Sequence, residues 1–271
     1  MIALRWEWIA IGYYSYMLIV ALIGRRFFGA RTRAFAGTAI CAIVLGARGF
    51  PADSPRLDSL AFSIVVPTLV LVGGYWLSGS FFVSPMRRVE EWLMAVDERF
   101  LRRTGILAAY QAGPRLVREF FEIAYVLVYA VIPAGVATLA IGGHADAVPR
   151  FWAVVLLAEF VSYGTMPWLQ TRSPRVLESS PGTLQSEPAI RRLNASILNR
   201  GSIQANTVPS GHAAGAVATA LAVADAMPLA GVVFLLLAAA IVAATVLGRY
   251  HYLVDSLLGI VVALGAWGLC R

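Results

Sequence analysis

The sequence predicts an all-α fold, a polytopic bundle of transmembrane helices. Of its 271 residues, 59% are apolar and only 14% carry a charge, whereas an average soluble domain is about 45–50% apolar and about 25% charged. The mean hydropathy is +0.73. Because so few polar residues cannot cover the remaining apolar surface in water, lipid must cover it. These values exclude a soluble enzyme, a disordered chain and a coiled coil.

Apolar segments of membrane-spanning length indicate how many helices to expect. A transmembrane helix needs about 20 predominantly apolar residues. An eighth, shorter segment at 34–47 lies between Arg33 and Arg48. We therefore expect an N-terminal transmembrane extension over residues 1–58, with one or two spans, followed by a six-span unit over 59–271. The seven strong candidates are residues 8–24, 59–83, 120–141, 151–169, 210–227, 229–248 and 252–270.

Two connections between these segments are long enough to carry function. Within residues 84–119, apolar side chains recur at helical spacing with charged residues between them, which predicts an amphipathic helix lying in the membrane interface. The apolar positions are Val89, Trp92, Leu93, Val96 and Phe100. Residues 170–208 are polar and rich in Arg, Ser, Pro and Asn, so we expect a loop there.

The sequence Pro209-Ser210-Gly211-His212 stands where this polar connection enters an apolar helix. Ser210 can cap that helix, and the free amides and partial positive charge of a helix N-terminus suit an anion such as phosphate. Gly211 permits close approach of the backbone, and His212 lies within the first turn, where it can release a proton. The alternative interpretation is an ordinary helix cap beside a surface histidine.

A second pair of ionisable residues opens the last apolar segment. His251 and Asp255 are four residues apart, so on a helix they share one face. An aspartate that accepts a hydrogen bond from one imidazole nitrogen fixes the tautomer and leaves the other nitrogen as a nucleophile. Ionisable residues at membrane depth are costly and indicate function. A structural His–Asp pair is the alternative.

Arginines form the third candidate feature. Arg172 and Arg175 lie on either side of a proline-stiffened turn and can clamp phosphate oxygens, and Arg249 stands two residues before His251. An even number of predicted crossings separates these arginines from each other and from His212. All three motifs are therefore expected at one face of the membrane, where they predict a phosphate site.

At these residues the chain resembles the type 2 phosphatidic acid phosphatase superfamily of membrane lipid phosphatases, over roughly residues 59–271. The family has a six-helix core, and this chain matches its PSGH motif at 209–212 and its H-x3-D motif at His251 and Asp255. The resemblance implies that His251 forms a phosphohistidine, that Asp255 orients it, and that His212 protonates the leaving lipid oxygen and later activates water. It also implies substrate-binding roles for Arg172, Arg175, Ser210, Gly211 and Arg249.

Two departures from the family pattern bear on the reaction. The basic residue seven positions before an Arg-Pro pair is missing, and Thr245 stands where the third motif has an arginine. The Arg-Ser-Pro-Arg and Arg-Tyr-His-Tyr forms look more like the branch with inositol phosphorylceramide and sphingomyelin synthases, which pass a phospho-head group to a lipid alcohol. We expect a metal-independent lipid phosphatase acting on a lipid phosphate or pyrophosphate. The alternatives are a lipid phosphotransferase, a non-catalytic lipid transporter or scaffold, and a haloperoxidase-like vanadate site.

The expected partners are a lipid phosphate substrate and membrane lipids, with no nucleic acid, no cofactor and no metal. Cys41 and Cys270 are far apart and form neither a disulfide framework nor a metal-ligand cluster. With the resemblance, the apolar segments indicate a multi-pass protein of a bacterial inner membrane. All 22 basic residues are arginines, and with eight spans 17 of them fall on the motif side, which the positive-inside rule places in the cytoplasm. Bacterial relatives usually face their site outward, so orientation and oligomeric state stay open.

Overall fold

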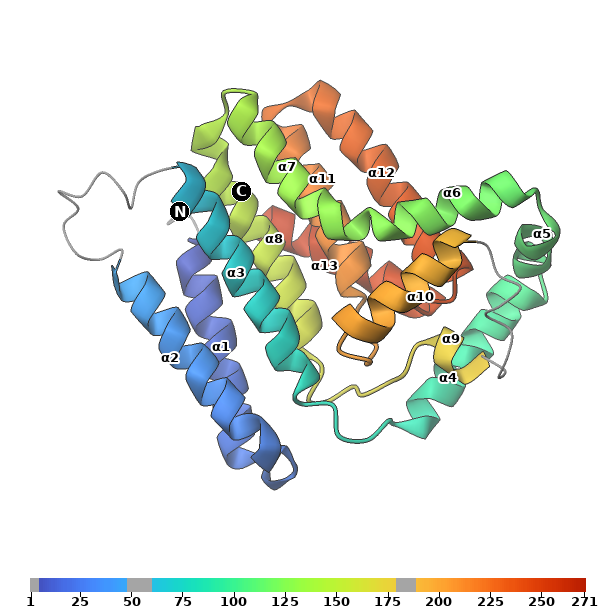
Figure 1. The fold of residues 1–271 in the computed structure, drawn as a ribbon, viewed down its shortest axis with the longest axis horizontal. Helices are drawn as coiled ribbons and strands as arrows, with labels where there is room; N and C mark the ends of the chain where they lie inside the picture. The colour runs from blue at the N-terminus through green and yellow to red at the C-terminus, as the bar shows by residue number, and fades with distance from the viewer. Residues whose placement is uncertain (1–4, 48–59, 179–188) are drawn as a thin grey trace.

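The computed structural model describes residues 5–47, 60–178 and 189–271, and over these ranges the predicted all-α fold class is confirmed (Figure 1). An isolated antiparallel bridge joins Thr171 to Asn206. The helices are α1 (Trp6–Ile23), α2 (Arg31–Ala47), α3 (Leu60–Gly79), α4 (Arg87–Asp97), α5 (Ile106–Ala112), α6 (Arg115–Val126), α7 (Val128–Ile141), α8 (Val148–Gly164), α9 (Pro174–Glu178), α10 (Ala189–Gly201), α11 (Gly211–Ala226), α12 (Pro228–Leu247) and α13 (Leu253–Leu269).

Several helices have the length and composition of membrane spans. Among the described residues, α1 and α12 are each long and apolar enough to cross a membrane, and α6 with α7 qualifies as a bent pair. Residues 63–79 of α3 and the whole of α13 are shorter apolar helices. These helices agree with the composition of the chain, and the protein is a membrane protein.

The segment predicted as a span over residues 120–141 lies in a bent pair of helices. The segment is broken at Leu127, and α6 and α7 meet at a bend of 60°. The two halves differ in pattern: α6 buries Glu122 and Tyr125 while Phe120 stays exposed, whereas α7 is apolar on every side. An amphipathic helix favours the membrane surface, whereas a uniformly apolar helix favours the membrane interior. The sequence pattern therefore accounts for the different directions of α6 and α7.

The connection over residues 170–208 also holds more structure than a loop. It contains the short helix α9 and the amphipathic helix α10, which packs against α6. Around them, residues 170–173 and 205–208 form no helix, and the bridge between Thr171 and Asn206 holds these two stretches side by side. The connection is therefore a folded cover over one end of the bundle.

The central helix of the bundle is α11, which packs against α7, α8, α12 and α13. Its sequence is composed mostly of alanine, glycine and valine, and small residues let helix backbones approach closely in a membrane protein. A Cβ added to Gly135 of α7 would meet Thr219 of α11 at 2.5 Å. This close packing fixes the N-terminus of α11, where His212 lies.

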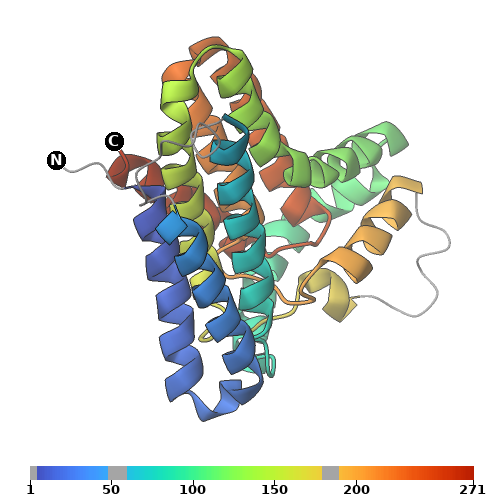
Figure 2. The same ribbon diagram turned by 60° about the vertical axis from the view of Figure 1, so that its left-hand side comes forward.

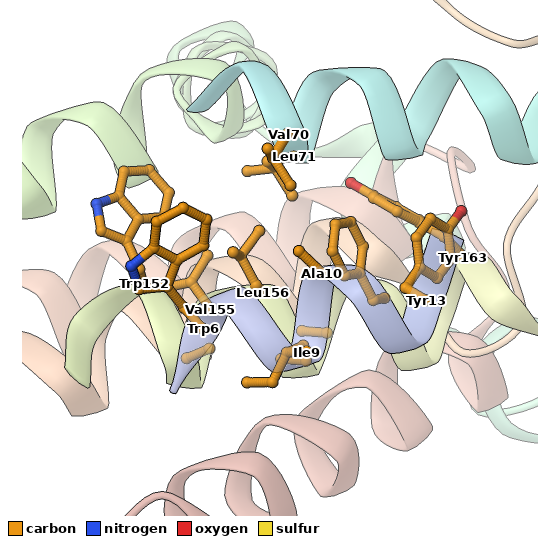
Figure 3. Packing of buried hydrophobic residues seen from close by; sticks show 14 of the residues in the cluster. Trp6, Ile9, Ala10, Tyr13, Val70, Leu71, Trp152, Val155, Leu156 and Tyr163 are labelled. Atoms are coloured by element: carbon orange, nitrogen blue, oxygen red, sulfur yellow. The ribbon is translucent and has the colours of Figure 1, made fainter. Parts of the chain in front are cut away.

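A second part of the core joins α1, α3 and α8 (Figure 3). Aromatic and branched side chains interlock there, and the Tyr13 ring stacks on Phe160 with centroids 4.1 Å apart. Helix α2 lies beside α1 and α3 (Figures 1 and 2). Side chains that fill this region include Trp6, Ile9, Ala10, Val70, Leu71, Trp152, Val155 and Leu156.

The turn between α1 and α2 lies at the end of the bundle that carries the motifs. Arg26 donates to the Pro167 carbonyl at 2.7 Å and Arg33 donates to the Ser80 hydroxyl at 3.1 Å. Pro167 follows α8 and Ser80 follows α3, and the chain enters the residue 170–175 segment directly afterwards. The arginines at 25–33 are therefore on the motif side, as the count of eight apolar segments requires.

The amphipathic helix expected within residues 84–119 is present as α4, which continues into a π-helical turn over Glu98–Arg102. Its face toward the protein contains two carboxylates, Glu90 and Asp97, together with Leu93 and Leu101. Both carboxylates pair with arginines, Glu90 with Arg172 and Asp97 with Arg249. Trp92 and Phe100 are exposed, at 57% and 51%, and point away from the bundle as an interfacial anchor requires.

Candidate active site

His251 and Asp255 lie together at the start of α13. The His251 Nδ1 is 3.5 Å from the Asp255 Oδ2, and both side chains are buried. They do not share a helix face as the spacing predicted, because α13 begins at Leu253 and His251 belongs to the turn before it. Since the carboxylate faces Nδ1, Nε2 is the nitrogen left for chemistry.

The Asp255 carboxylate is held by more than the histidine. Its Oδ2 accepts from the Tyr252 amide at 3.1 Å and from the Asn206 Nδ2 at 2.8 Å. Asn206 also donates from Nδ2 to the Thr171 hydroxyl and from its amide to the Thr171 carbonyl. One asparagine therefore connects the pair of His251 and Asp255 to the arginine-bearing loop and to the segment that precedes α11.

The turn that carries His251 is fixed by the last residues of α12. The amides of Tyr250 and His251 both donate to the Thr245 carbonyl, at 2.9 and 3.0 Å. The Thr245 hydroxyl lies 3.0 Å from that of Ser256 on α13. Arg249 adopts a left-handed conformation with φ 63°, which a non-glycine residue takes only at some cost in energy. Thr245, which stands where the family pattern has an arginine, therefore supplies a buried hydroxyl that lies between α12 and α13.

The Pro209–His212 motif forms the N-terminus of α11, and Ser210 caps that helix as predicted. Its hydroxyl oxygen accepts from the Ala213 amide at 3.3 Å. The Ser210 amide donates to the Asp255 carbonyl at 2.9 Å, and the Gly211 amide donates to the Thr207 hydroxyl at 3.1 Å. These three amides already have acceptors within the chain, so substrate binding by Ser210 and Gly211 stays a prediction.

Gly211 does permit a close approach, but its neighbour is another helix of the bundle. A Cβ at this position would lie 2.8 Å from the Glu159 Oε2 and 2.9 Å from the Tyr163 ring. Both residues belong to α8, and Tyr163 also lines the cavity described next. The glycine therefore brings the first turn of α11 against α8, which places His212 at the wall of that cavity.

A cavity of about 290 Å³ lies in front of the two histidines. The His212 and His251 ring centroids are 5.2 Å apart, and Arg175 is the guanidinium among the lining residues. The rest of the lining combines aromatic rings with short polar side chains, which suits a polar head group rather than an acyl chain. It includes Tyr75, Tyr125, Tyr163, Tyr250, Ser173, Ser202, Gln204, Asn206 and Thr207.

Of the three predicted phosphate-binding arginines, the structure places only Arg175 in this cavity. Its guanidinium lies over the Tyr250 ring, 5.2 Å from the centroid, and its amide donates to the Arg249 carbonyl at 2.9 Å. The residue is thus joined by backbone and side chain to the turn that carries His251. Arg175 therefore lines the same cavity as His212 and His251.

Arg172 and Arg249 lie outside the cavity lining and are held by carboxylates. Arg172 makes a bidentate pair with Glu90, with its Nε and an Nη at 3.0 and 2.7 Å from the two oxygens, and its amide donates to the same carboxylate. Arg249 is only 6% exposed and pairs with Asp97 at 2.6 Å and with Glu178 at 2.7 Å. Phosphate binding by these two arginines stays a prediction.

The ion pairs shift the acidities of their members. Burial raises the pKa of Glu90, but the hydrogen bonds and charge of Arg172 outweigh it and hold that pKa below its ordinary value. The pKa of Glu178 is also below its ordinary value, because Arg249 and Arg102 lower it by more than burial raises it. Both carboxylates are therefore ionised at neutral pH and hold the arginine-bearing turns in place.

Sequence reasoning missed several residues that shape this site. Asp97, Glu90 and Glu178 gave no local signal, because their arginine partners are distant in the sequence. Asn206 was one of many polar residues in its segment. Tyr125 had a recognisable signal, since a tyrosine in an apolar helix needs a partner for its hydroxyl.

The contact between α13 and the N-terminus of α11 leads to a stability prediction. A Cβ on Gly259 would meet the Ser210 carbonyl oxygen at 2.6 Å and the Ala213 Cβ at 2.9 Å. We expect Gly259→Ala to destabilise the fold by about 1–3 kcal/mol, as overpacking typically does. Thermal unfolding in detergent measures the effect. Gly265→Ala on the same helix is the control, because a Cβ there meets nothing within 4 Å, and equal melting temperatures for the two variants would contradict the prediction.

Comparison with known proteins assigns the family. The model of the PAP2 superfamily matches residues 91–269, which extends from α4 to the end of α13 and includes both histidines, Asp255 and Arg175. No curated protein and no solved structure matches the chain. The match does not select the sphingolipid synthase branch within the superfamily. The chain belongs to the PAP2 superfamily, whose members are typically phosphatases or phosphotransferases, and its function is of this type on lipid phosphates.

Proposed function

We propose that this protein is a metal-independent membrane lipid phosphatase that hydrolyses a lipid phosphate or pyrophosphate through a phosphohistidine intermediate. One observation carries the proposal: His212 and His251 stand 5.2 Å apart, by their ring centroids, at the wall of one cavity. One of them is backed by a buried carboxylate, and a guanidinium lines the same cavity. This is the arrangement of a nucleophile, an acid and an anion ligand around one bound group.

In the first step, the His251 Nε2 attacks phosphorus and the bond from phosphorus to the lipid oxygen breaks. His212 gives a proton to that oxygen, so the lipid leaves as an alcohol, or as a lipid monophosphate when the substrate is a pyrophosphate. The nucleophile is oriented because the Asp255 Oδ2 faces the His251 Nδ1 at 3.5 Å. The carboxylate also stabilises the positive charge that develops on the imidazole.

In the second step, water attacks the phosphohistidine. His212, now neutral, takes a proton from the water as the bond from phosphorus to nitrogen breaks, and inorganic phosphate leaves. Both histidines return to their starting states, so atoms and protons balance over the cycle. If a lipid alcohol enters in place of water, the same steps move the phospho-group to that alcohol and the enzyme is a phosphotransferase.

Arg175 is the proposed phosphate ligand. Fixed positive groups aimed at the equatorial oxygens are the main source of rate enhancement in phosphoryl transfer. Arg172 and Arg249, each paired with carboxylates at 2.6–3.1 Å, are proposed to support the two turns rather than to bind phosphate. The Arg175 guanidinium then binds the phosphate directly, while those of Arg172 and Arg249 hold the surrounding turns in place.

We further propose a multi-pass arrangement in a bacterial inner membrane, with residues 1–58 as a transmembrane extension and 59–271 as the catalytic domain. The rings of Trp92 on α4 and Phe120 on α6 are exposed. Because aromatic side chains concentrate near the membrane surface, these rings support a site at that depth. The lipid tail then reaches the cavity between helices while its head group stays near water.

A substrate panel tests the proposal. Purified protein in detergent is incubated with phosphatidate, phosphatidylglycerol phosphate and a polyprenyl pyrophosphate, in EDTA, and released phosphate is measured. We expect release from at least one lipid, undiminished by EDTA and inhibited by vanadate.

Parallel reactions separate the alternatives. A labelled phospholipid supplied with ceramide or diacylglycerol reveals a phosphotransferase if a new labelled phospholipid forms without free phosphate. Lipid movement across vesicles without turnover would indicate a transporter. Absence of both release and transfer would contradict an enzymatic function.

A further inference from the structure

Tyr125 occupies a position between the two halves of the site. Its ring stacks on Tyr250, with centroids 3.5 Å apart and planes at 9°, and on its other neighbour His212, with centroids 5.5 Å apart and planes at 7°. The Tyr125 hydroxyl lies 3.4 Å from the His212 Nε2. Tyr129 meets the same imidazole edge-on at 6.1 Å.

The Tyr125 ring is held in place by Tyr250, which stacks on it and is itself fixed by a carboxylate. Tyr250 donates its hydroxyl proton to the Glu122 Oε2 at 2.5 Å. That carboxylate also accepts from Arg191 at 2.9 Å and from the Asn194 Nδ2 at 2.6 Å, both on α10. Glu122 therefore holds Tyr250 in place, and Tyr250 holds the Tyr125 ring that stacks on it. A fixed Tyr125 ring allows its hydroxyl group to hold the His212 imidazole in one orientation.

The two histidines of the site have different partners on different ring nitrogens. His251 presents Nδ1 to the Asp255 carboxylate, while His212 presents Nε2 to a neutral phenol. A carboxylate stabilises an imidazolium and makes the opposite nitrogen a better nucleophile. A neutral hydroxyl fixes the ring without adding negative charge, so the imidazolium keeps its readiness to give up a proton. Active sites assign the acid and base roles to two ionisable groups by placing them in contrasting environments.

We infer that Tyr125 is a positioning residue for His212, and that its hydroxyl oxygen accepts a hydrogen bond from Nε2–H and so confines proton exchange with the substrate to Nδ1. The inference rests on the proposed function. When His212 is an imidazolium, Nδ1 gives its proton to the leaving lipid oxygen, and the other proton stays on Nε2, where it is hydrogen-bonded to the Tyr125 oxygen. Neutral His212 then has its lone pair on Nδ1, where it takes a proton from water. Tyr125 keeps its own hydroxyl proton throughout and undergoes no net change.

A double-mutant cycle tests this role. We expect Tyr125→Phe to lower kcat for phosphatidate by roughly 10- to 100-fold, a part of the 10²- to 10⁴-fold that a general acid contributes. The loss for p-nitrophenyl phosphate is expected to be much smaller, because its leaving group needs little protonation. In a His212→Gln background, Tyr125→Phe should cause no further loss, since the histidine that it positions is gone. Tyr14→Phe is the control, because it also removes one buried hydroxyl, donated to the Val70 carbonyl at 2.9 Å.

A direct measurement of the tautomers does not depend on turnover. The chain has three histidines, so nitrogen-15 NMR of histidine-labelled protein in detergent can assign each ring by single substitution. We expect neutral His212 to have its proton on Nε2 and neutral His251 to have its proton on Nδ1, which are opposite tautomers. In Tyr125→Phe the His212 signal should shift toward a mixture of tautomers while that of His251 stays unchanged.

The outcomes distinguish the inference from the function on which it rests. If the wild type hydrolyses phosphatidate but Tyr125→Phe and His212→Gln lose activity independently, or if His212 has its proton on Nδ1 in the wild type, the positioning role is overturned and the phosphatase is not. If the wild type neither hydrolyses nor transfers a phospho-group from any lipid, the proposed function fails, and the inference fails with it.

Discussion

Replacement of His251 by glutamine is expected to abolish turnover, with a fall in kcat of at least about 10⁴-fold, the scale seen when a nucleophile is removed. Glutamine fills a similar volume but has no ring nitrogen to attack phosphorus. With a lipid substrate labelled in its phosphate, wild-type protein quenched in base should retain a labelled phosphoprotein that acid destroys, as phosphohistidine requires. The variant should retain none.

His144 supplies the matched control for this experiment. It lies between α7 and α8, outside the lining of the cavity, so His144→Gln should form the phosphoprotein at the wild-type rate. Full activity in His251→Gln would show that phosphorus is attacked by another group. Loss of activity in both variants, accompanied by a lower melting temperature, would instead report a general effect of replacing histidine.

The second large effect is expected for Asp255→Asn, with a fall in kcat of about 10³- to 10⁴-fold, comparable to the effect of the same change in other His–Asp pairs. The Asp255 Oδ2 accepts from the Asn206 Nδ2 and the Tyr252 amide, both of them donors. The new amide keeps its oxygen toward these donors, so the atom that faces the His251 Nδ1 at 3.5 Å becomes a neutral amide oxygen. The negative charge that stabilises the positive imidazole is then lost, which makes Nε2 a weaker nucleophile.

The rate of phosphoprotein formation measures this effect directly, because the change acts before the hydrolysis step. Asp225→Asn is the control carboxylate: it lies near the opposite end of α11, where it accepts from the Trp267 Nε1 at 2.8 Å. A normal rate in Asp255→Asn would show that the negative charge of the carboxylate does not activate His251. A normal rate of formation with slow release of phosphate would place its role in the second step instead.

Much of the fold could be predicted because the signals are local. Apolar runs of about 20 residues identified the segments that form α1, α3, α8, α11, α12 and α13, and Ser210 marked the start of α11 as its cap. The bend at Leu127 was missed, because hydropathy averaged over a window does not distinguish an amphipathic half from a uniformly apolar half. The relation between His251 and Asp255 was predicted correctly as proximity, but for the wrong reason, since a turn and not a helix face brings them together.

By itself, the sequence determined the membrane setting, the all-α class and the family, and it predicted the two histidines and the aspartate as site residues. Each of these follows from composition or from residues only a few positions apart. The tertiary structure alone decided which arginine faces the cavity: Arg172 and Arg249 are taken by carboxylates 82 and 152 residues away in the chain. It also placed Tyr125 against His212 across 87 residues. Such pairs depend on how α4 and α6 fold back over the end of the bundle, and a buried charge or hydroxyl accepts whatever partner that packing brings within reach.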